Sequence, residues 1–386
     1  MLYIQACSAT ASCGAGCREL QRAFFEEQSG LSPWPGPLPT YVGTVAGLDT
    51  VRLPDDLQTF DCRNNRLAEH AIRADHFESA VKAAADQFGT SRIGLIVGTS
   101  SSGIASLEDA YCRKRSEPFD FSDRLEKTFE LHATANYLKQ RLQLSGPALT
   151  VSSACSSSAQ SLVLAHQWME RKWIDAAVVA GIDSLCMTTL FGFRSLNLVA
   201  PTPCRPFDRR RAGINLGEAA VLMLVSNRPG PWRLAGYGES ADAYHITAPH
   251  PDGEGARLAM SRALTRAGIR PSDIGYIHAH GTGTRLNDLS EDRAISHLFP
   301  PEIPVSSTKG WTGHTLGAAG MLGALISLLT LESGLLPRTL NTEEPDPGLR
   351  SRILLEAERT RPNYILTNAF GFGGNNCALI FAGAGP

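Results

Sequence analysis

A strand-and-turn pattern occurs twice in this sequence and constrains the fold more than any other feature. The first copy reads Ile93-Gly-Leu-Ile-Val-Gly-Thr-Ser-Ser-Ser-Gly, and the second reads Ile274-Gly-Tyr-Ile-His-Ala-His-Gly-Thr-Gly-Thr. Val151-Ser-Ser-Ala and Val305-Ser-Ser-Thr follow the two copies in the same order, and each leads through a turn into an apolar helical pattern. Because the same elements recur in the same order, the sequence predicts a duplicated α/β unit.

Short apolar strands alternate with helical patterns along the chain. Residues 93–98 and 175–182 are predicted as buried strands, and 67–88 is predicted as one helix because its apolar residues recur every three to four positions. A second long apolar helix is predicted at 317–331. This alternation is typical of βαβ units. The Pro/Gly-containing segment 228–232 is the predicted seam, which divides the chain into residues 1–228 and 229–386.

One cysteine lies where a strand pattern gives way to a helical one. The apolar run 148–151 ends in Ser-Ser-Ala-Cys155-Ser-Ser-Ser, and a mostly apolar helical pattern follows. This order predicts Cys155 at or just before a helix N-terminus, where unpaired N–H groups and the helix dipole favour a thiolate. A small buried core cysteine is the alternative interpretation, since free cysteines are among the most buried residues.

Three further Gly-, Ser- and Thr-rich clusters follow apolar runs. They contain His280, Lys309 with His314, and the segment 368–376. Loops at strand C-termini are where α/β folds build their sites. Taken singly, each histidine is more often structural. A thiol nucleophile together with two imidazoles is nevertheless a set suited to acyl chemistry at a thioester.

The composition limits the functional class. The 36 Lys and Arg residues nearly balance 38 Asp and Glu, so the net charge of −2 gives no support for binding nucleic acid or an anionic membrane. No apolar run approaches the roughly 20 residues that span a bilayer, and the N-terminus lacks the pattern of a signal peptide. The nine cysteines have no CxxC or Cys/His metal spacing. We expect a cytoplasmic protein with neither a disulfide framework nor a bound metal.

Five segments in a fixed order carry a resemblance to a known family. They are Ser-Ala-Cys155-Ser-Ser-Ser, Cys204-Arg-Pro-Phe-Asp208, His280-Gly-Thr-Gly-Thr with Asp288 and Glu291 downstream, Lys309-Gly-Trp-Thr-Gly-His314-Thr-Leu-Gly-Ala-Ala-Gly, and Asn368-Ala-Phe-Gly-Phe-Gly-Gly-Asn. Because of these five segments, the chain resembles an elongating β-ketoacyl-acyl carrier protein synthase (ketosynthase) of the thiolase superfamily. The resemblance implies a thiolase-like α/β fold, in which two duplicated βαβ halves pack as a five-layered α-β-α-β-α core.

The resemblance also implies a reaction, a decarboxylative Claisen condensation. Cys155 would take an acyl group from the phosphopantetheine thioester of an acyl carrier protein. His280 and His314 would stabilise the negative charge that develops when malonyl carrier protein loses carbon dioxide. Because the carrier protein brings the 4'-phosphopantetheine, the enzyme is expected to need no cofactor and no metal of its own.

Other residues receive supporting roles from the same resemblance. Lys309 and Glu291 match an ion pair that fixes the histidines, although a purely structural pair is the alternative. The N–H groups of Cys155 and Phe372 would form an oxyanion hole, and the Phe372 ring would gate the acyl pocket unless it is ordinary core packing. The substrate- and phosphopantetheine-binding residues are predicted to be Thr282, Thr284, Ile214 and Phe370, with turn capping as the alternative role of the threonines.

The chain departs from the family pattern at one segment. The usual Arg-Asp-Gly-Phe-Val-x-Gly-Glu-Gly reads Arg211-Ala-Gly-Ile-Asn-Leu-Gly-Glu-Ala here, so Ile214 replaces an aromatic residue near the cysteine and changes the predicted pocket. This variant, with the segment 248–253, resembles synthases of bacterial aryl-polyene and related polyketide clusters. The resemblance implies a homodimer, or a heterodimer with a chain-length-factor-like partner that lacks the cysteine. Candidates for carrier docking are Arg63, Arg66, Arg209, Arg210 and Arg211, although for most of them a solvated charged surface is the favoured interpretation. Candidates for the acyl pocket are Ile104, Gly192 and Phe193.

Two other functions compete with an active condensing enzyme. A chain-length-factor-like subunit would have little activity of its own, but such partners usually lose the cysteine that this chain keeps. A degradative thiolase would use a second cysteine near the C-terminus. Cys377 is close to the glycine-rich loop, but it falls inside an apolar strand pattern, so we interpret it as a core residue.

Overall fold

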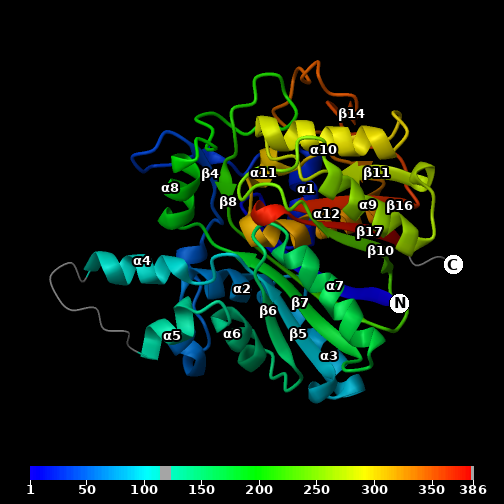
Figure 1. The fold of residues 1–386 in the computed structure, drawn as a ribbon. Coiled ribbons are helices and arrows are strands. Elements are labelled where there is room, and N and C mark those ends of the chain that lie inside the picture. The colour runs from blue at the N-terminus through cyan, green and yellow to red at the C-terminus, as the bar shows by residue number, and fades with distance from the viewer. Residues whose placement is uncertain (114–122, 384–386) are drawn as a thin grey trace.

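The computed structural model describes residues 1–113 and 123–383 (Figure 1). Its described residues form a twelve-stranded sheet with the order β14-β12-β11-β16-β17-β10-β1-β9-β7-β5-β6, and β2 pairs with β1. The strands are β1 Leu2–Ala11, β2 Gly14–Ala15, β5 Ile93–Gly98, β6 Ala148–Val151, β7 Ala176–Asp183, β9 Ala219–Ser226, β10 Trp232–Ala241, β11 Ile274–His278, β12 Pro304–Ser306, β14 Arg352–Ile353, β16 Tyr364–Phe370 and β17 Asn375–Gly383. The described residues also form two smaller sheets. One contains β3 (Ser32–Pro33), β4 (Tyr41–Gly43) and β8 (Leu216–Gly217), and the other pairs β13 (Leu335–Leu336) with β15 (Glu358–Arg359).

The two ends of the large sheet repeat one topology. In the order β6-β5-β7-β9-β1 the first two pairings are parallel and the last two are antiparallel. The order β12-β11-β16-β17-β10 has the same sequence of pairings. The repeated sequence pattern lies in β5 and β11, which occupy equivalent places. The predicted seam at 228–229 falls between β9 and β10, and the division into two units stays a prediction.

Helices cover both halves and also separate them. Helix α7 (Ser157–Glu170) contacts β5, β6 and β7 on one side and β17 on the other, and α12 (Ala319–Ser333) contacts β7 and β9 as well as β16 and β17. The outer helices α2 (Arg63–Arg73), α3 (Phe77–Phe88) and α6 (Ala133–Arg141) pack on the first half (Figure 1). Helix α9 (Glu254–Ala267) packs on the second half, and α10 (Arg285–Leu298) packs on α9. This is the predicted five-layered α-β-α-β-α arrangement.

The sequence-based prediction of one continuous helix at 67–88 is wrong. The predicted helix 67–88 is two helices, α2 (Arg63–Arg73) and α3 (Phe77–Phe88), because Asp75 and His76 adopt left-handed φ angles of 52° and 56°. The Asp75 carboxylate accepts hydrogen bonds from the N–H of Cys17, which holds this break. The other helices are α1 Cys17–Phe25, α4 Ile104–Arg113, α5 Asp123–Phe129, α6 Ala133–Arg141, α8 Met187–Ser195, α9 Glu254–Ala267, α10 Arg285–Leu298 and α11 Lys309–Thr312.

Helix α12 and the 3-10 turn before it are unusually apolar. Within the described residues, the segment Leu316–Ser333 is long and apolar enough to cross a membrane, so the expectation that no apolar run approaches that length is wrong. Inside the protein, however, 78% of the segment is buried. Its neighbours are strands of both halves of the sheet and helix α7. The segment is therefore accounted for as the central core helix.

Candidate active site

Cys155 lies in a tight turn between β6 and α7. Ala154 has a φ of 52°, a left-handed conformation that costs a non-glycine residue about 1 kcal/mol or more. Serines hold this turn: Ser157 Oγ accepts from the N–H of Ser153 at 2.9 Å and donates to the carbonyl of Ala154 at 2.5 Å, and Ser156 Oγ donates to the carbonyl of Ser153 at 2.9 Å. Because α7 begins at Ser157, the prediction that Cys155 lies just before a helix is confirmed.

The Cys155 thiol is buried and protonated at neutral pH. Burial raises the pKa of the thiol to about 11, against the opposing effects of the Lys309 charge and of the N–H groups of Phe372 and Cys155. The expected effect of the N–H groups, which favours a thiolate, is therefore present but is outweighed in the resting site by desolvation, since a helix dipole contributes only about 1 kcal/mol. Both N–H groups lie at the sulfur, where an oxyanion hole for an acyl group on Cys155 would have to be.

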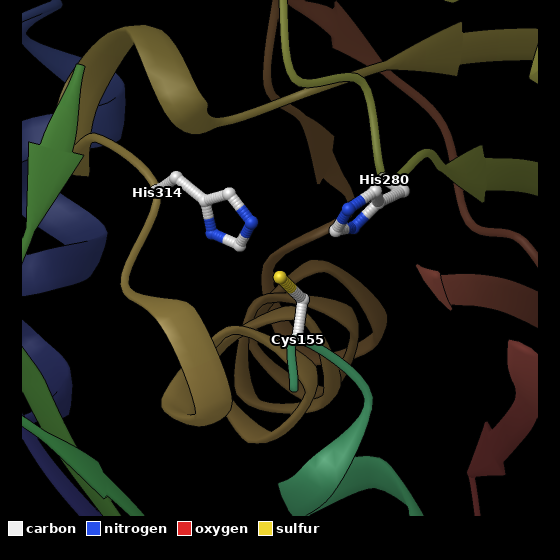
Figure 2. Close-up of side chains that lie close together, drawn as sticks. All are labelled: Cys155, His280 and His314. Carbon is white, nitrogen blue, oxygen red and sulfur yellow. The ribbon is translucent and has the colours of Figure 1, made fainter. Parts of the chain in front are cut away.

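His280 and His314 flank the sulfur from two sides (Figure 2). Their ring centroids are 5.3 Å apart with an interplanar angle of 83°, and the ligand atoms of the thiol and both rings lie within 4.8 Å of one another. Burial, and next the charge of Lys309, lower the pKa of both imidazoles well below the usual value, so both are neutral. The N–H of Leu316 donates to His314 Nδ1 at 3.2 Å, which assigns the ring proton to Nε2.

The same three groups also form a possible set of metal ligands. A thiol and two neutral imidazoles at this spacing resemble the donors of zinc sites. The charge of Lys309, which is felt by all three groups, opposes the binding of a cation. The expectation of a metal-free site, which came from the cysteine spacing and the family resemblance, stays a prediction.

Lys309 and Glu291 both act on the main chain of the His280 loop. Lys309 Nζ donates a hydrogen bond to the carbonyl of His280. Glu291 accepts from the N–H groups of His280 at 2.8 Å and Gly281 at 2.7 Å. The predicted ion pair is therefore not a direct contact in the described structure, because Lys309 binds the carbonyl and Glu291 binds the N–H groups of the same loop. At longer range the Glu291 charge raises the pKa of Lys309, against the larger lowering caused by burial.

Two buried polar residues to which the sequence analysis gave no role hold this arrangement. Asn368 Nδ2 donates to Glu291 Oε1 at 3.0 Å. Asp183, at the end of β7, accepts hydrogen bonds from residues 99–101 and from the N–H of Gly317, so it ties the first half to the turn before α12. The sequence did contain a signal for Asp183, because it is an acidic residue at the end of the otherwise apolar strand β7.

A cavity of about 300 Å³ reaches the sulfur. Its lining includes Cys155, His280, His314, Thr282, Thr284, Ile214, Phe370 and Phe372. The two threonine hydroxyls are 2.9 Å apart, and the Phe370 ring centroid is 5.8 Å from that of His280. The cavity thus brings together most of the predicted site residues. Because Cys155 lines this cavity, its position argues against the alternative of an inert core cysteine.

Only one of the three residues predicted to line the acyl pocket lies at this cavity. Phe193 lines the cavity, and its ring centroid lies 5.4 Å from that of Phe372. Ile104 and Gly192 are not among its lining residues. Cys377 is fully buried in β17, which confirms the prediction of a core residue and removes the second cysteine that a thiolase would need in the cavity.

All five arginines predicted to dock a carrier protein are engaged in salt bridges. Arg63 pairs with Glu218 at 2.5 Å, Arg66 with Asp61 at 2.6 Å, Arg210 with Glu343 at 2.6 Å, and Arg209 with Glu344. Arg211 is only 3% exposed and binds Asp346 at 2.7 Å. The prediction of Arg211 as a docking residue is therefore wrong, because its charge is buried and already paired.

Comparison with known families decides the identity of this site. The model of the β-ketoacyl synthase N-terminal domain matches residues 67–229, and that of the C-terminal domain matches residues 233–343. The chain belongs to the β-ketoacyl synthase family. A curated relative of this ketosynthase, 3-oxoacyl-[acyl-carrier-protein] synthase 2 of Staphylococcus aureus, is 31% identical over 379 residues, with 88% of this chain and 93% of the relative covered.

Solved structures extend the likeness over the whole fold. The ketosynthase is similar to a chain of the complex between the ketosynthase ApeO and its chain length factor ApeC from Xenorhabdus doucetiae, with a TM-score of 0.92, 35% identity and coverage of 99% and 98% of the two chains. A chain of the ishigamide ketosynthase/chain length factor is similar with a TM-score of 0.89, 26% identity and coverage of 100% and 99%. These likenesses support the predicted thiolase-like fold.

Proposed function

We propose that this chain is the condensing subunit of a carrier-protein-dependent synthase of the polyene or polyketide type. Its activity is that of its family, β-ketoacyl-[acyl carrier protein] synthesis by acyl transfer. The observation that carries the assignment to a condensing subunit is the retained Cys155 thiol between two neutral imidazoles, with the N–H groups of Cys155 and Phe372 at the sulfur. A chain-length-factor-like subunit would have no use for that arrangement.

In the first half-reaction Cys155 accepts the acyl chain. Its sulfur attacks the carbonyl carbon of the acyl-phosphopantetheine thioester, and the negative oxygen is held by the N–H groups of Cys155 and Phe372. The phosphopantetheine sulfur leaves as the carbon–sulfur bond breaks, and the proton that Cys155 loses ends on that leaving thiol. Because the pKa of the resting thiol is about 11, removal of this proton is part of the free-energy cost of the attack.

In the second half-reaction the histidines act on malonyl carrier protein. N–H donors on His280 and His314 stabilise the thioester oxygen while carbon dioxide leaves and an enolate forms. The enolate carbon then attacks the acyl carbonyl on Cys155, the carbon–sulfur bond breaks, and the Cys155 sulfur departs as a thiolate that takes a proton from water. Thr282 and Thr284, at the cavity wall, suit hydrogen bonds to the phosphopantetheine arm. The carrier's phosphopantetheine supplies the thioester, and no further cofactor enters these steps.

A second ketosynthase-like subunit is part of the proposal. The ApeO complex pairs a ketosynthase with a chain length factor, and this chain is 35% identical to a chain of that complex. Strand β6 is an edge of the sheet with Leu149 42% exposed, and α8 exposes Met187 and Phe191 to 42% and 43%. Unpaired edges and clustered apolar side chains favour association. We therefore infer a heterodimer, with a homodimer as the alternative and acyl carrier protein as the transient partner.

The test of the function separates the two half-reactions. Cys155→Ala should abolish acyl transfer, measured as acyl-enzyme by intact mass spectrometry, and should retain some decarboxylation of malonyl carrier protein. Cys377→Ala is the matched control, since that cysteine is buried in β17 away from the cavity and should leave acylation at Cys155 intact. If Cys155→Ala still elongates an acyl carrier protein, the proposed mechanism is wrong.

The partner has its own test. The chain should elongate carrier-bound primers faster when co-purified with a chain-length-factor-like protein from its own genome than when purified alone. The molar mass of each preparation, from light scattering, distinguishes a heterodimer from a homodimer. A homodimer with full activity alone would overturn the heterodimer.

A further inference from the structure

Asn215 is a buried amide between the two parts of the site that handle the malonyl thioester. It follows Ile214 in the segment 213–217, and it has no exposed surface. The family pattern has valine at this position, so the amide is a departure of this chain from that pattern. A buried amide is costly unless its donors and acceptor are paired. Its hydrogen bonds therefore show what it holds together.

The main chain of this segment contacts both catalytic loops. The N–H of His314 donates to the carbonyl of Asn215 at 2.7 Å. Two residues earlier, the N–H of Gly213 donates to the carbonyl of Gly283 at 3.0 Å, between the two threonines that line the cavity. A shift of the segment 213–217 would therefore move His314 relative to the loop 282–284.

The side chain of Asn215 fixes the segment in place. Its Oδ1 accepts the N–H of Cys204 at 2.5 Å, and its Nδ2 donates to the carbonyls of Ala200 and Thr202, each at 3.2 Å. Cys204 in turn donates from its Sγ to the carbonyl of Thr282 at 3.3 Å. The amide is thus fully paired, and it joins the segment before Cys204 to both the His314 loop and the threonine loop.

We propose that Asn215 is a positioning residue for decarboxylation, which holds His314 at the correct place relative to the phosphopantetheine arm bound at Thr282 and Thr284. The inference rests on the proposed function. It acts through His314, and none of its hydrogen bonds reaches the turn that carries Cys155. Acylation of Cys155 should therefore depend on it much less than decarboxylation, because small displacements of a positioned donor are expensive in the transition state.

The test compares the half-reactions in two variants. Asn215→Leu keeps the shape of the side chain and removes all its hydrogen bonds, and Asn215→Val installs the residue of the family pattern. Both should decarboxylate malonyl carrier protein about tenfold more slowly, or with a correspondingly higher KM, while acylation of Cys155 changes less than about twofold. Thermal unfolding and the acylation rate together show that each variant is folded.

The outcomes separate this inference from the proposed function. An equal loss in both half-reactions, or no loss in either, in a folded variant would overturn the positioning role. If Asn215→Leu does not fold, Asn215→Val carries the same comparison. Failure of the unmodified chain to form an acyl-enzyme at Cys155 would instead refute the proposed function itself.

Discussion

Lys309 donates its hydrogen bond to the main-chain carbonyl of His280, and this contact ties a buried positive charge to the loop that carries one catalytic imidazole. The same charge lowers the pKa of His280, His314 and Cys155. Lys309 is therefore a positioning residue that both shapes the loop and sets the protonation of the site. Glu291 completes the loop by accepting its N–H groups.

Replacing this charge should shift the pH dependence of decarboxylation. In Lys309→Met the imidazoles lose the charge that lowers their pKa, so their pKa values rise and the acid-side loss of activity moves to higher pH. The rate at neutral pH should fall about a hundredfold. The measurement is carbon dioxide release from malonyl carrier protein across pH. Lys82→Met, at an exposed site on α3, is the control, and an unshifted acid limb in Lys309→Met would contradict the electrostatic role.

The raised thiol pKa predicts the reactivity of the resting enzyme. Because the pKa of Cys155 is about 11, the thiolate fraction at neutral pH is small. Alkylation of Cys155 by iodoacetamide should then accelerate by about tenfold per pH unit between about pH 7 and about pH 9. Peptide mass spectrometry at short times reports the rate at this cysteine alone. A rate that is already flat near neutral pH would mean that a thiolate forms in the resting site.

Ile214 should set the size of the acyl group that Cys155 accepts. It is 2% exposed, lines the cavity and packs with Leu190, Val199 and Leu316. Ile214→Phe adds volume to a packed wall, so acylation by long acyl groups should slow roughly tenfold relative to acetyl groups. Ile214→Val, which only removes a methyl group, should leave that ratio nearly unchanged. Equal slowing for all chain lengths would place the acyl chain elsewhere.

Asp183 should contribute mainly to stability. In Asp183→Ala the buried N–H groups of Ser100, Ser101 and Gly317 lose their acceptor, which should lower the free energy of unfolding by about 3 kcal/mol. Urea denaturation at fixed protein concentration measures the change. Asp175→Ala, just before the same strand, removes a partly exposed salt bridge to Arg92 and should cost under about 1 kcal/mol. Similar values for the two variants would contradict the linking role of Asp183.

The sequence predicted the parts of the fold that depend on local pattern. The repeat at 93–103 and 274–284 predicted two equivalent strands, and apolar runs predicted β5, β7 and α12. It failed at 67–88, where helical periodicity continues through residues whose φ angles break the helix. The reason is tertiary: Asp75 turns to accept the N–H of Cys17 in a different element, and no local pattern records that partner.

For the site, the sequence by itself determined which chemical groups are present. Cys155, His280 and His314 were identified from clusters that follow apolar runs or open a helix, and Lys309 and Glu291 received their roles from the family resemblance. Only the tertiary structure decided how they interact. Burial makes the sulfur a thiol rather than a thiolate, and Lys309 and Glu291 bind the His280 loop rather than each other. Desolvation and main-chain hydrogen bonds depend on neighbours far apart in the chain, so no sequence pattern could have fixed them.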